Sequence, residues 1–456
     1  MAKNEIYLGA DVGGTKILAA VVSGSGKVLV RLKMPTPREG GAQAGVAAIK
    51  EAMNGALRGE GAAGGRLKGI GIAFPGVIEP KAGRIVFAPN MTLLTNIDLV
   101  PLMEKEYRVP VMVGNDVNLG TLGEHWMGAA RGTQNAVGIF PGTGIGGGLI
   151  IRGELYSGSR EIAGEIGHMI IQMDGPICGC KMKGCLEAIA SRTAVERDLR
   201  DAVKAGRPTR LTDWLQGDLS LIKSSVLKRG LDEHDALVVE TMRRASVVLG
   251  VACINIRHIL DPEVIVLGGG MIEACGDFML PIIEETAATD TMSGARPGGR
   301  IVRSELGDDA VFLGAVAAVR AKLGQKLPVP AKEELPAYPA VGAFSFGRVE
   351  VDGETYETDI HIRGNGKVKE RKKKRIKEQY GDTHIVGVEE ISKLCKGRPA
   401  TLVIGAGEGK LLKLTSEAKK HLADSGIETR LLPSPEAVKV FNALGGRKAL
   451  LLHVTC

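Results

Sequence analysis

The sequence lacks the segments that would place a protein in a membrane or direct it out of the cell. Its 456 residues contain no apolar run of about 18, so no transmembrane helix is expected. The opening, MAKNEIYLGADVGG, has no apolar stretch long enough for a signal peptide. Only seven cysteines are present, and in such a chain we expect free thiols or metal ligands rather than disulfides. These absences predict a cytoplasmic protein that does not bind membranes.

Most of the chain also lacks an excess of either positive or negative charge. The formal net charge is +7, but residues 341–456 hold 21 Lys and Arg against 15 Asp and Glu, a net +6. Residues 1–340 are nearly neutral at +1, so a preference for acidic partners can come only from the last segment. Its densest basic run, KERKKKRIK at 369–377, could meet phosphates. Such a run more often forms a solvated face, and we do not expect nucleic acid as a partner.

Glycine, by contrast, is abundant at 63 residues, and proline is concentrated in one place. Residues 324–340, GQKLPVPAKEELPAYPA, contain four prolines, a density that prevents helix and indicates a semi-rigid linker. This linker separates a long first region from a small α/β domain at 341–456.

The first region repeats one local pattern, a strand, a glycine turn and a second strand, near residue 11 and again near residue 143. Helical patterns alternate with the other strand-like runs. The repetition predicts an α/β protein with two related lobes that face a cleft. We place the first lobe at 1–117 together with 308–323, and the second at 118–307.

The first glycine turn, DVGGTK, is a candidate for binding the phosphates of a nucleotide. Its backbone N–H groups and its threonine hydroxyl would approach phosphate oxygens, and the aspartate would hold a hydrated Mg²⁺. A plain hairpin turn is the alternative. The candidate ligands of ATP and Mg²⁺ are Asp11, Gly13, Gly14, Thr15 and Lys16.

Two further glycine turns have the same potential. The segment GTGIGGG formally matches the dinucleotide fingerprint, but strand rather than helix follows it, which excludes that interpretation. A glycine hairpin paired with the first one suits a nucleotide held between two lobes. The third turn, LGGG after the strand PEVIV, would form a platform for adenine and ribose, or only a strand-to-helix turn. The candidates are Gly142, Thr143, Gly144, Gly268 and Gly269.

The segment GNDVN follows the buried strand PVMV and contains a candidate general base. The carboxylate of Asp116, placed at the end of a strand beside amides, can be oriented and partly desolvated, as a base for a sugar hydroxyl requires. The alternative is a helix N-cap for the LGTLGEHW segment that follows.

One histidine and three cysteines fall within 18 residues amid glycine and proline: His168, Cys178, Cys180 and Cys185. This is the Cys₃His pattern of closed, structural zinc sites, which leave no position open for water. A redox cluster or unrelated buried thiols are the alternatives. Glu165 and Glu187 flank the cluster and would bind hydroxyl groups or remain solvated.

Taken together and in this order, DVGGTK, GNDVN, GTGIGGG and GEIGH with CGCKMKGCLE resemble the ROK family of repressors, open reading frames and sugar kinases, over residues 5–323. The resemblance implies an actin-like ATPase (ribonuclease H-like) fold, Mg²⁺–ATP as phosphoryl donor and a hexose or N-acetylhexosamine as acceptor. We also expect a homodimer or homotetramer. By the same resemblance Asp116 is the catalytic base. The implied sugar ligands are Gly76, Asn90, Asn115, Glu165, His168 and Glu187. Residues 341–456 are similar to the adipogenesis-associated domain family, which implies a fold but no activity.

The function we expect is ATP-dependent phosphorylation of a hexose, foremost glucose, or of an N-acetylhexosamine, at the 6-hydroxyl. A sugar-sensing repressor of the same family is the rival, and it would need a DNA-binding helix-turn-helix before the first motif. Only ten residues precede Asp11, which favours the kinase. A catalytically inactive scaffold is a further alternative, against which the presence of Asp116 argues.

Overall fold

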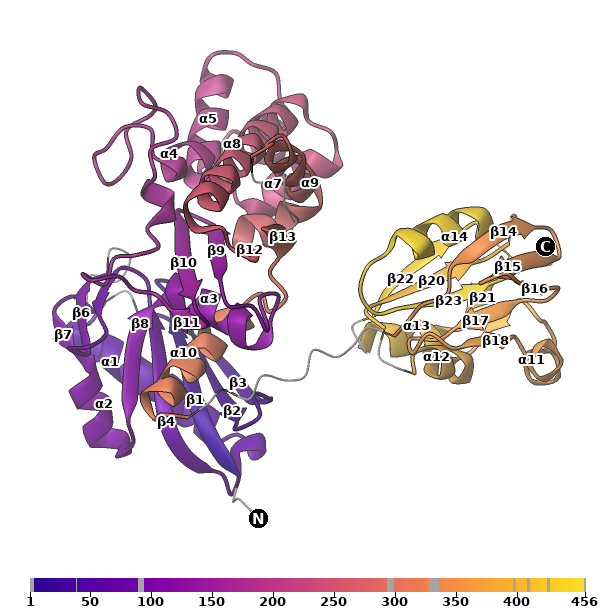
Figure 1. The fold of residues 1–456 in the computed structure, drawn as a ribbon, viewed down its shortest axis with the longest axis horizontal. Helices are drawn as coiled ribbons and strands as arrows, with labels where there is room; N and C mark the ends of the chain where they lie inside the picture. The colour runs from indigo at the N-terminus through magenta and orange to yellow at the C-terminus, as the bar shows by residue number, and fades with distance from the viewer. Residues whose placement is uncertain are drawn as a thin grey trace. The chain divides into compact units, whose positions relative to one another are not determined.

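The computed structural model describes residues 4–37, 39–88, 94–292, 299–325, 327, 336–396, 399–407, 411–424 and 427–454. The chain forms two compact units, Met1–Lys332 and Glu333–Cys456, and Figure 1 shows each with its own sheets and helices. The division between them falls inside the proline-rich segment. No helix among the described residues combines the length and the apolar character needed to cross a bilayer.

The first unit begins with a five-stranded sheet in the order β3-β2-β1-β4-β8. Its first three strands form an antiparallel meander, and β4 and β8 run parallel to β1. The strands are β1 (Glu5–Val12), β2 (Lys16–Ser23), β3 (Val28–Pro35), β4 (Arg66–Phe74) and β8 (Val111–Asn115). Helices α1 (Gly41–Leu57) and α2 (Leu99–Tyr107) pack on one face, and a small sheet is formed by β5 (Val77–Glu79), β6 (Arg84–Phe87) and β7 (Ile97–Asp98).

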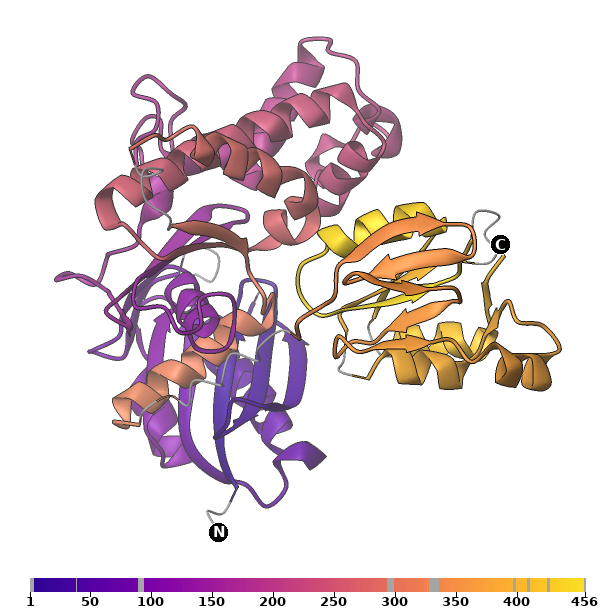
Figure 2. The ribbon, with the colours of Figure 1, turned by 45° about the vertical axis from the view of Figure 1, so that its right-hand side comes forward.

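A second five-stranded sheet, in the order β11-β10-β9-β12-β13, repeats this topology, again with three antiparallel strands followed by two parallel ones. The strands are β9 (Ala136–Pro141), β10 (Ile145–Ile151), β11 (Glu154–Leu155), β12 (Val264–Leu267) and β13 (Arg300–Arg303). The helices of this lobe, which Figure 2 shows gathered above its sheet, are α4 (Leu186–Ala190), α5 (Arg192–Lys204), α6 (Leu211–Trp214), α7 (Ser224–Asp232), α8 (Ala236–Leu260) and α9 (Gly270–Ala288). The two lobes expected from the repeated glycine turns are therefore present, in an actin-like ATPase fold.

Helices α3 (Asp116–Met127) and α10 (Asp309–Lys322) contribute to one apolar core together with residues from both sheets. The two helices approach so closely that glycine is required at their contact. A Cβ on Gly314 would lie 1.6 Å from the carbonyl oxygen of Leu119, and one on Gly123 would lie 2.0 Å from that of Ala310. This contact holds the middle of α3 against the first half of α10.

The second unit is built on the sheet β18-β17-β23-β20-β22, with a separate three-stranded sheet β14-β15-β16. Its strands are β14 (Val341–Ser345), β15 (Arg348–Val351), β16 (Glu354–Tyr356), β17 (Ile360–Ile362), β18 (Val368–Glu370), β19 (Ile385–Val386), β20 (Thr401–Gly405), β21 (Lys413–Leu414), β22 (Glu428–Leu432) and β23 (Lys448–Leu452). Helix α14 (Ser434–Ala443) contributes to one core, and α12 (Val388–Leu394) and α13 (Ser416–Asp424) to another. The basic run extends from β18 into the short helix α11 (Lys373–Tyr380).

Candidate active site

The first glycine turn joins β1 to β2 and is held by hydrogen bonds at both ends. The backbone N–H of Gly13 donates to the carbonyl oxygen of Lys16 at 2.9 Å, and the Thr36 hydroxyl donates to the carbonyl oxygen of Gly13 at 2.6 Å. Lys16 Nζ lies 2.9 Å from Oδ2 of Asp308, directly before α10. The sequence reasoning missed Asp308, because nothing in the sequence links residues so far apart.

Two half-buried carboxyl groups, Asp11 at the end of β1 and Asp116 at the start of α3, both have raised pKa values. Burial, as the largest cause, and the charge of Asp116 together raise the pKa of Asp11 to about 7, while Lys16 opposes the shift. Burial also raises the pKa of Asp116, against the hydrogen bond that its Oδ1 accepts from the Val117 N–H at 2.9 Å. A divalent cation would favour the ionised forms of both groups, and carboxylate oxygens are the ligands that Mg²⁺ prefers. The residues present therefore fit Mg²⁺.

Asn115 is the N-cap of α3. Its Oδ1 accepts from the N–H groups of Val117 at 3.0 Å and Asn118 at 3.1 Å, and its Nδ2 donates to the carbonyl oxygen of Gly76 at 3.2 Å. The alternative interpretation of this motif as a helix N-cap is thus confirmed, and the capping residue is Asn115, not Asp116. Asp116 remains the first residue of the helix, with its carboxyl group available for chemistry.

A small cavity of about 80 Å³ lies beside the start of α3 and brings together three of the expected sugar ligands, Gly76, Asn115 and Glu165. Asn118 and Glu161 also line it and were not expected from the sequence. The Oδ1 atom of Asn118 is buried and, among the described residues, has no hydrogen-bond partner, so a substrate hydroxyl would satisfy it. Asn118 follows Asn115 by three residues, and this helical spacing was the signal that could have identified it.

Of the remaining sugar candidates, Asn90 lies outside the described residues. His168 and Glu187 are described but do not line this cavity. His168 nevertheless adjoins it, because its Nε2 lies 4.0 Å from Oε2 of Glu165.

The four expected zinc ligands come together, with their ligand atoms all within 4.8 Å of one another. Cys178 Sγ lies 3.6 Å from His168 Nδ1, and Cys180 Sγ lies 3.6 Å from Cys185 Sγ. Zinc–sulfur bonds of about 2.3 Å in a tetrahedron place two sulfurs a little under 4 Å apart, so the donor set fits Zn²⁺. Burial raises the pKa of Cys178 to about 12, which keeps the thiol protonated until a metal replaces the proton.

Glu187 connects the cysteine cluster to the second glycine turn. Its Oε2 accepts from the N–H of Ile145 at 2.9 Å, and its Oε1 lies 3.7 Å from Cys178 Sγ. A Cβ on Gly144 would lie 2.2 Å from Oε2, so a larger residue in this turn would displace the Glu187 carboxylate. Thr143, in the same turn, accepts through its hydroxyl from Arg192 Nη2 at 2.7 Å. The turn is thereby held against both the cluster and α5.

The third glycine turn lies at the start of α9. Gly268 donates its N–H to the carbonyl oxygen of Ile139 at 3.0 Å, and Gly269 has φ of 77°, where a Cβ would also meet the Pro141 carbonyl oxygen at 3.0 Å. In the first turn of α9, burial raises the pKa of Glu273, and the charge of Asp308 adds to the shift. Because Asp308 also pairs with Lys16, this helix start and the first glycine turn share one neighbourhood.

Two sheets of one topology, with glycine turns, carboxyl groups of raised pKa and a polar cavity between the lobes, define a two-lobe phosphotransferase of the actin-like class. The chain belongs to the ROK family, whose model matches residues 7–322. A glucokinase from Halalkalibacterium halodurans is 33% identical over 309 residues, which cover 68% of this chain and 93% of that protein.

A solved ROK family glucokinase from Streptomyces griseus, in complex with glucose and AMPPNP, is 30% identical, with a TM-score of 0.60 over 69% of this chain and 99% of that one. The family also includes regulators, such as a xylose repressor from Caldicellulosiruptor bescii that is 30% identical over 251 residues, 55% of this chain and 62% of that protein. Fold, site and relatives together make the first unit an ATP-dependent sugar kinase.

Residues 341–453 match a second family, described as a protein of unknown function (DUF498/DUF598). This is the family that the comparisons give for the C-terminal unit, and the expected resemblance to the adipogenesis-associated domain family is not shown by them. The match assigns no activity to the unit.

Proposed function

We propose that the first unit transfers the γ-phosphoryl group of ATP to the 6-hydroxyl of a hexose, with glucose the preferred acceptor. The observation that carries the proposal is the position of Asp116. It directly follows Asn115, which lines the polar cavity, and its charge is close enough to Asp11 to raise the pKa of that carboxyl group. It is a half-buried carboxylate whose pKa is raised by desolvation, as a general base acting on a hydroxyl requires.

On the nucleotide side, catalysis of phosphoryl transfer is mainly positioning and charge stabilisation. The backbone N–H groups of the first and second glycine turns would hold the phosphates, with Lys16 adding a positive charge. The start of α9 at Gly268 and Gly269 would receive adenine and ribose. Asp11 would hold Mg²⁺, which when bound neutralises phosphate charge.

On the sugar side, Asn115, Asn118 and Glu165 would bind hydroxyl groups and place the 6-hydroxyl next to Asp116. As the hydroxyl oxygen attacks the γ-phosphorus, Asp116 would accept its proton and the bond to the β-phosphate oxygen would break. His168 would serve two purposes, with Nδ1 on a structural Zn²⁺ and Nε2 toward the sugar. Gly76, Asn90 and Glu187 complete the proposed sugar ligands.

A sugar panel tests the proposal directly. ADP release by the purified full-length chain is coupled to NADH oxidation with glucose, fructose, mannose, N-acetylglucosamine and N-acetylmannosamine. Glucose should give the highest kcat/KM, and ³¹P NMR should identify the product as the 6-phosphate. Preference for an N-acetylhexosamine, or a product other than the 6-phosphate, would overturn the proposed substrate while leaving the kinase class intact.

The rival proposal, a sugar-sensing regulator, is supported by the repressors among the relatives. It requires sugar-dependent binding to duplex DNA, which an electrophoretic mobility assay with genomic fragments would detect. We further propose a cytoplasmic homodimer or homotetramer. Sedimentation equilibrium measures the subunit number, and a monomeric active enzyme would overturn that part.

A further inference from the structure

The C-terminal unit contains a cavity that the kinase chemistry does not use. It has a volume of about 330 Å³ and lies among β17, β18, α11 and α12. This size is at the lower end of the range of about 300–1,000 Å³ that is usual for small-molecule sites. Five basic side chains line it: Arg363, Lys369, Lys372, Arg375 and Lys393. Part of the basic run at 369–377 therefore lines a concavity.

The basic side chains of the cavity outnumber the carboxylates available to neutralise them. Glu389 lies 3.0 Å from Arg375 Nη2 and 3.8 Å from Lys393 Nζ, which accounts for two of the five. Within the described part of the chain, the side chains of Arg363, Lys369 and Lys372 have no carboxylate partner, and Arg363 Nε is buried without a hydrogen bond. Three cations directed at one concavity favour an anionic ligand.

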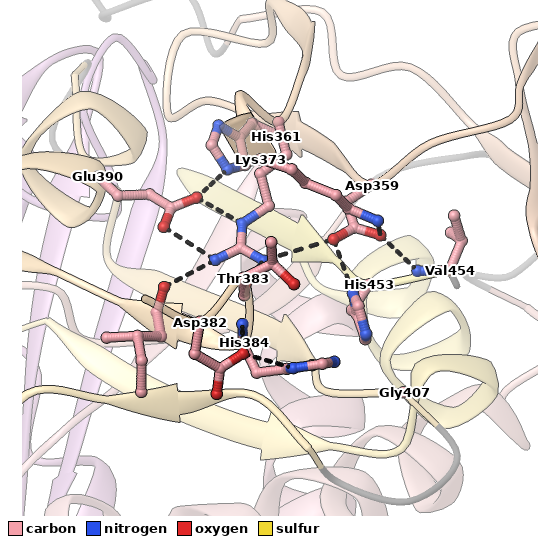
Figure 3. A network of polar contacts seen from close by, with 12 residues as sticks. Asp359, His361, Lys373, Asp382, Thr383, His384, Glu390, Gly407, His453 and Val454 are labelled. Carbon is pink, nitrogen blue, oxygen red and sulfur yellow. Dashed lines mark hydrogen bonds and ion pairs between the residues drawn. The ribbon is translucent and has the colours of Figure 1, made fainter. Parts of the chain in front are cut away.

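Two residues that line the cavity, Glu390 and His361, are here called its floor, and Figure 3 shows the network of polar contacts to which both belong. Glu390 Oε1 lies 2.7 Å from His361 Nε2 and 2.8 Å from Arg371 Nε, whose side chain is fully buried. The guanidinium group of Arg371 also donates hydrogen bonds to the carbonyl oxygens of Thr383 and Ile385. These contacts place polar groups on the floor without adding net charge.

One wall is formed by the aromatic ring of Tyr380. The ring lies directly against the backbone of Gly387, where a Cβ would be 2.1 Å from the Tyr380 hydroxyl oxygen. The cavity thus offers a cationic rim, a neutral polar floor and a flat aromatic wall.

We propose that this cavity binds a small phosphate monoester, with its phosphate on Arg363, Lys369 and Lys372 and its hydroxylated body over Glu390 and His361. A nucleic acid fits less well, because a cavity of about 330 Å³ has the size of a small-molecule site and would enclose a terminal phosphate rather than a continuing backbone. A sugar phosphate and a nucleoside monophosphate share the required chemistry, and the sugar kinase of the first unit releases a sugar phosphate as its product.

Hydrogen–deuterium exchange of the full-length chain tests this site without interference from the first unit, because it reads peptides of residues 368–394 separately. The probes are glucose 6-phosphate, AMP, inorganic phosphate and a 12-nucleotide RNA. We expect one of the two organic monoesters to protect these peptides at a lower concentration than inorganic phosphate does. Which of the two protects at the lower concentration identifies the source of the ligand.

The variant Lys369→Ala/Lys372→Ala should weaken this protection by about 100-fold, since each hydrogen bond to a charged group contributes roughly tenfold to affinity. Its matched control is Lys374→Ala/Lys377→Ala, which removes two exposed charges of the same run that do not line the cavity. The control should leave the protection unchanged. Equal effects of the two variants, equal protection by inorganic phosphate, or protection by RNA alone would each overturn the proposal, as would no protection by any probe.

Discussion

The two units shift the pKa of a desolvated carboxyl group in opposite directions. Asp11 in β1 is half-buried with the carboxyl group of Asp116 as an electrostatic neighbour, and its pKa is raised to about 7. Asp359, directly before β17, is buried, but hydrogen bonds from His453 Nδ1 at 2.6 Å and from the Val454 N–H at 3.0 Å outweigh burial and hold its pKa well below the usual range. Arg371 and Lys373 add positive charge within 3.4 Å and 3.0 Å.

The raised pKa of Asp11 indicates a site that lacks a positive charge, whereas the lowered pKa of Asp359 indicates a carboxylate that already has cationic and N–H partners. In the first unit, the carboxylates of Asp11 and Asp116 repel each other. This repulsion raises the free energy of the state without a bound cation and so favours cation binding. The network around Asp359 satisfies its own charges and stabilises the fold without help. In the C-terminal unit, three cations without a carboxylate partner among the described residues, Arg363, Lys369 and Lys372, line the cavity.

The largest effect is expected for Asp116→Asn. The variant should keep its fold and sugar affinity but lose about 10²–10⁴-fold in kcat, the usual contribution of a general base. Steady-state assays at saturating ATP and sugar measure this loss, and Asp213→Asn, at an exposed site on α6, is the control. Retention of more than a tenth of the kcat would remove Asp116 from the role of base.

The complementary change in the second unit is Arg371→Met. It leaves the carboxylates of Asp359 and Glu390 buried without their guanidinium partner, and should lower the free energy of unfolding of that unit by about 3–5 kcal/mol. The exposed pair Arg375–Glu389 provides the control, since Arg375→Met should cost no more than about 1 kcal/mol.

Urea titrations can separate the two units. Both tryptophans, Trp126 and Trp214, lie in the first unit, so their fluorescence follows only that unit, while circular dichroism follows both. A fluorescence midpoint that shifts with Arg371→Met would mean that the units do not unfold independently.

Cys180→Ser should release the zinc and reduce sugar affinity more than ATP affinity. The cluster includes His168, and its Cys178 contacts Glu187, so loss of the metal would disturb two proposed sugar ligands. The first glycine turn, in contrast, is fixed by its own hydrogen bonds. Elemental analysis and the KM values for sugar and ATP measure the outcome, with Cys395→Ser in the second unit as the control. A wild-type protein that contains no zinc while its cysteines are reduced would contradict the metal assignment.

The opposite pKa shifts of Asp11 and Asp359 predict that the stabilities of the two units depend on pH in opposite directions. The folded-state pKa of Asp11 is raised, so without Mg²⁺ its contribution favours the folded first unit at low pH and is lost as the pH rises toward and through about 7. The pKa values of Asp359 and Glu390 are lowered, so their contribution is present above about pH 4 and is lost as the pH falls further.

Thermal unfolding between pH 3 and 8, followed by fluorescence and circular dichroism, measures both trends. Asp11→Asn should flatten the response of the first unit between pH 4 and 8, and the second unit should not change. An unchanged slope in this variant would show that Asp11 does not govern the trend.

The smallest effect is expected for removal of the second unit. A chain that ends at Leu327 should keep its kcat within a few-fold, because all the kinase motifs precede that point. A chain that ends at Gly307 should not fold, because it lacks α10, whose apolar face packs on both sheets of the first unit. A soluble, zinc-containing but inactive Leu327 truncation would show that the second unit contributes to the active site.

Features that depend on neighbouring residues could be predicted from the sequence. The glycine turns, the spacing of His168 and the three cysteines, the long helix α8 and the proline-rich division follow from local backbone geometry. The repeated strand–turn–strand pattern indicated two related lobes, because a hairpin forms from contiguous residues. Even within a local motif, however, the assignment of the cap to Asn115 rather than Asp116 required the hydrogen bonds themselves.

Tertiary structure decided what the charged and polar side chains do. The pairing of Lys16 with Asp308, the bond from Ile145 to Glu187 and the placement of Asn118 at the cavity all join segments that pattern alone cannot relate. In the basic run, the sequence favoured a solvated face, yet folding buries Arg371 completely and directs Lys369 and Lys372 at a cavity. Local sequence determines which groups are available, but burial and distance to other charges determine their pKa values and partners, and these exist only once the chain has folded.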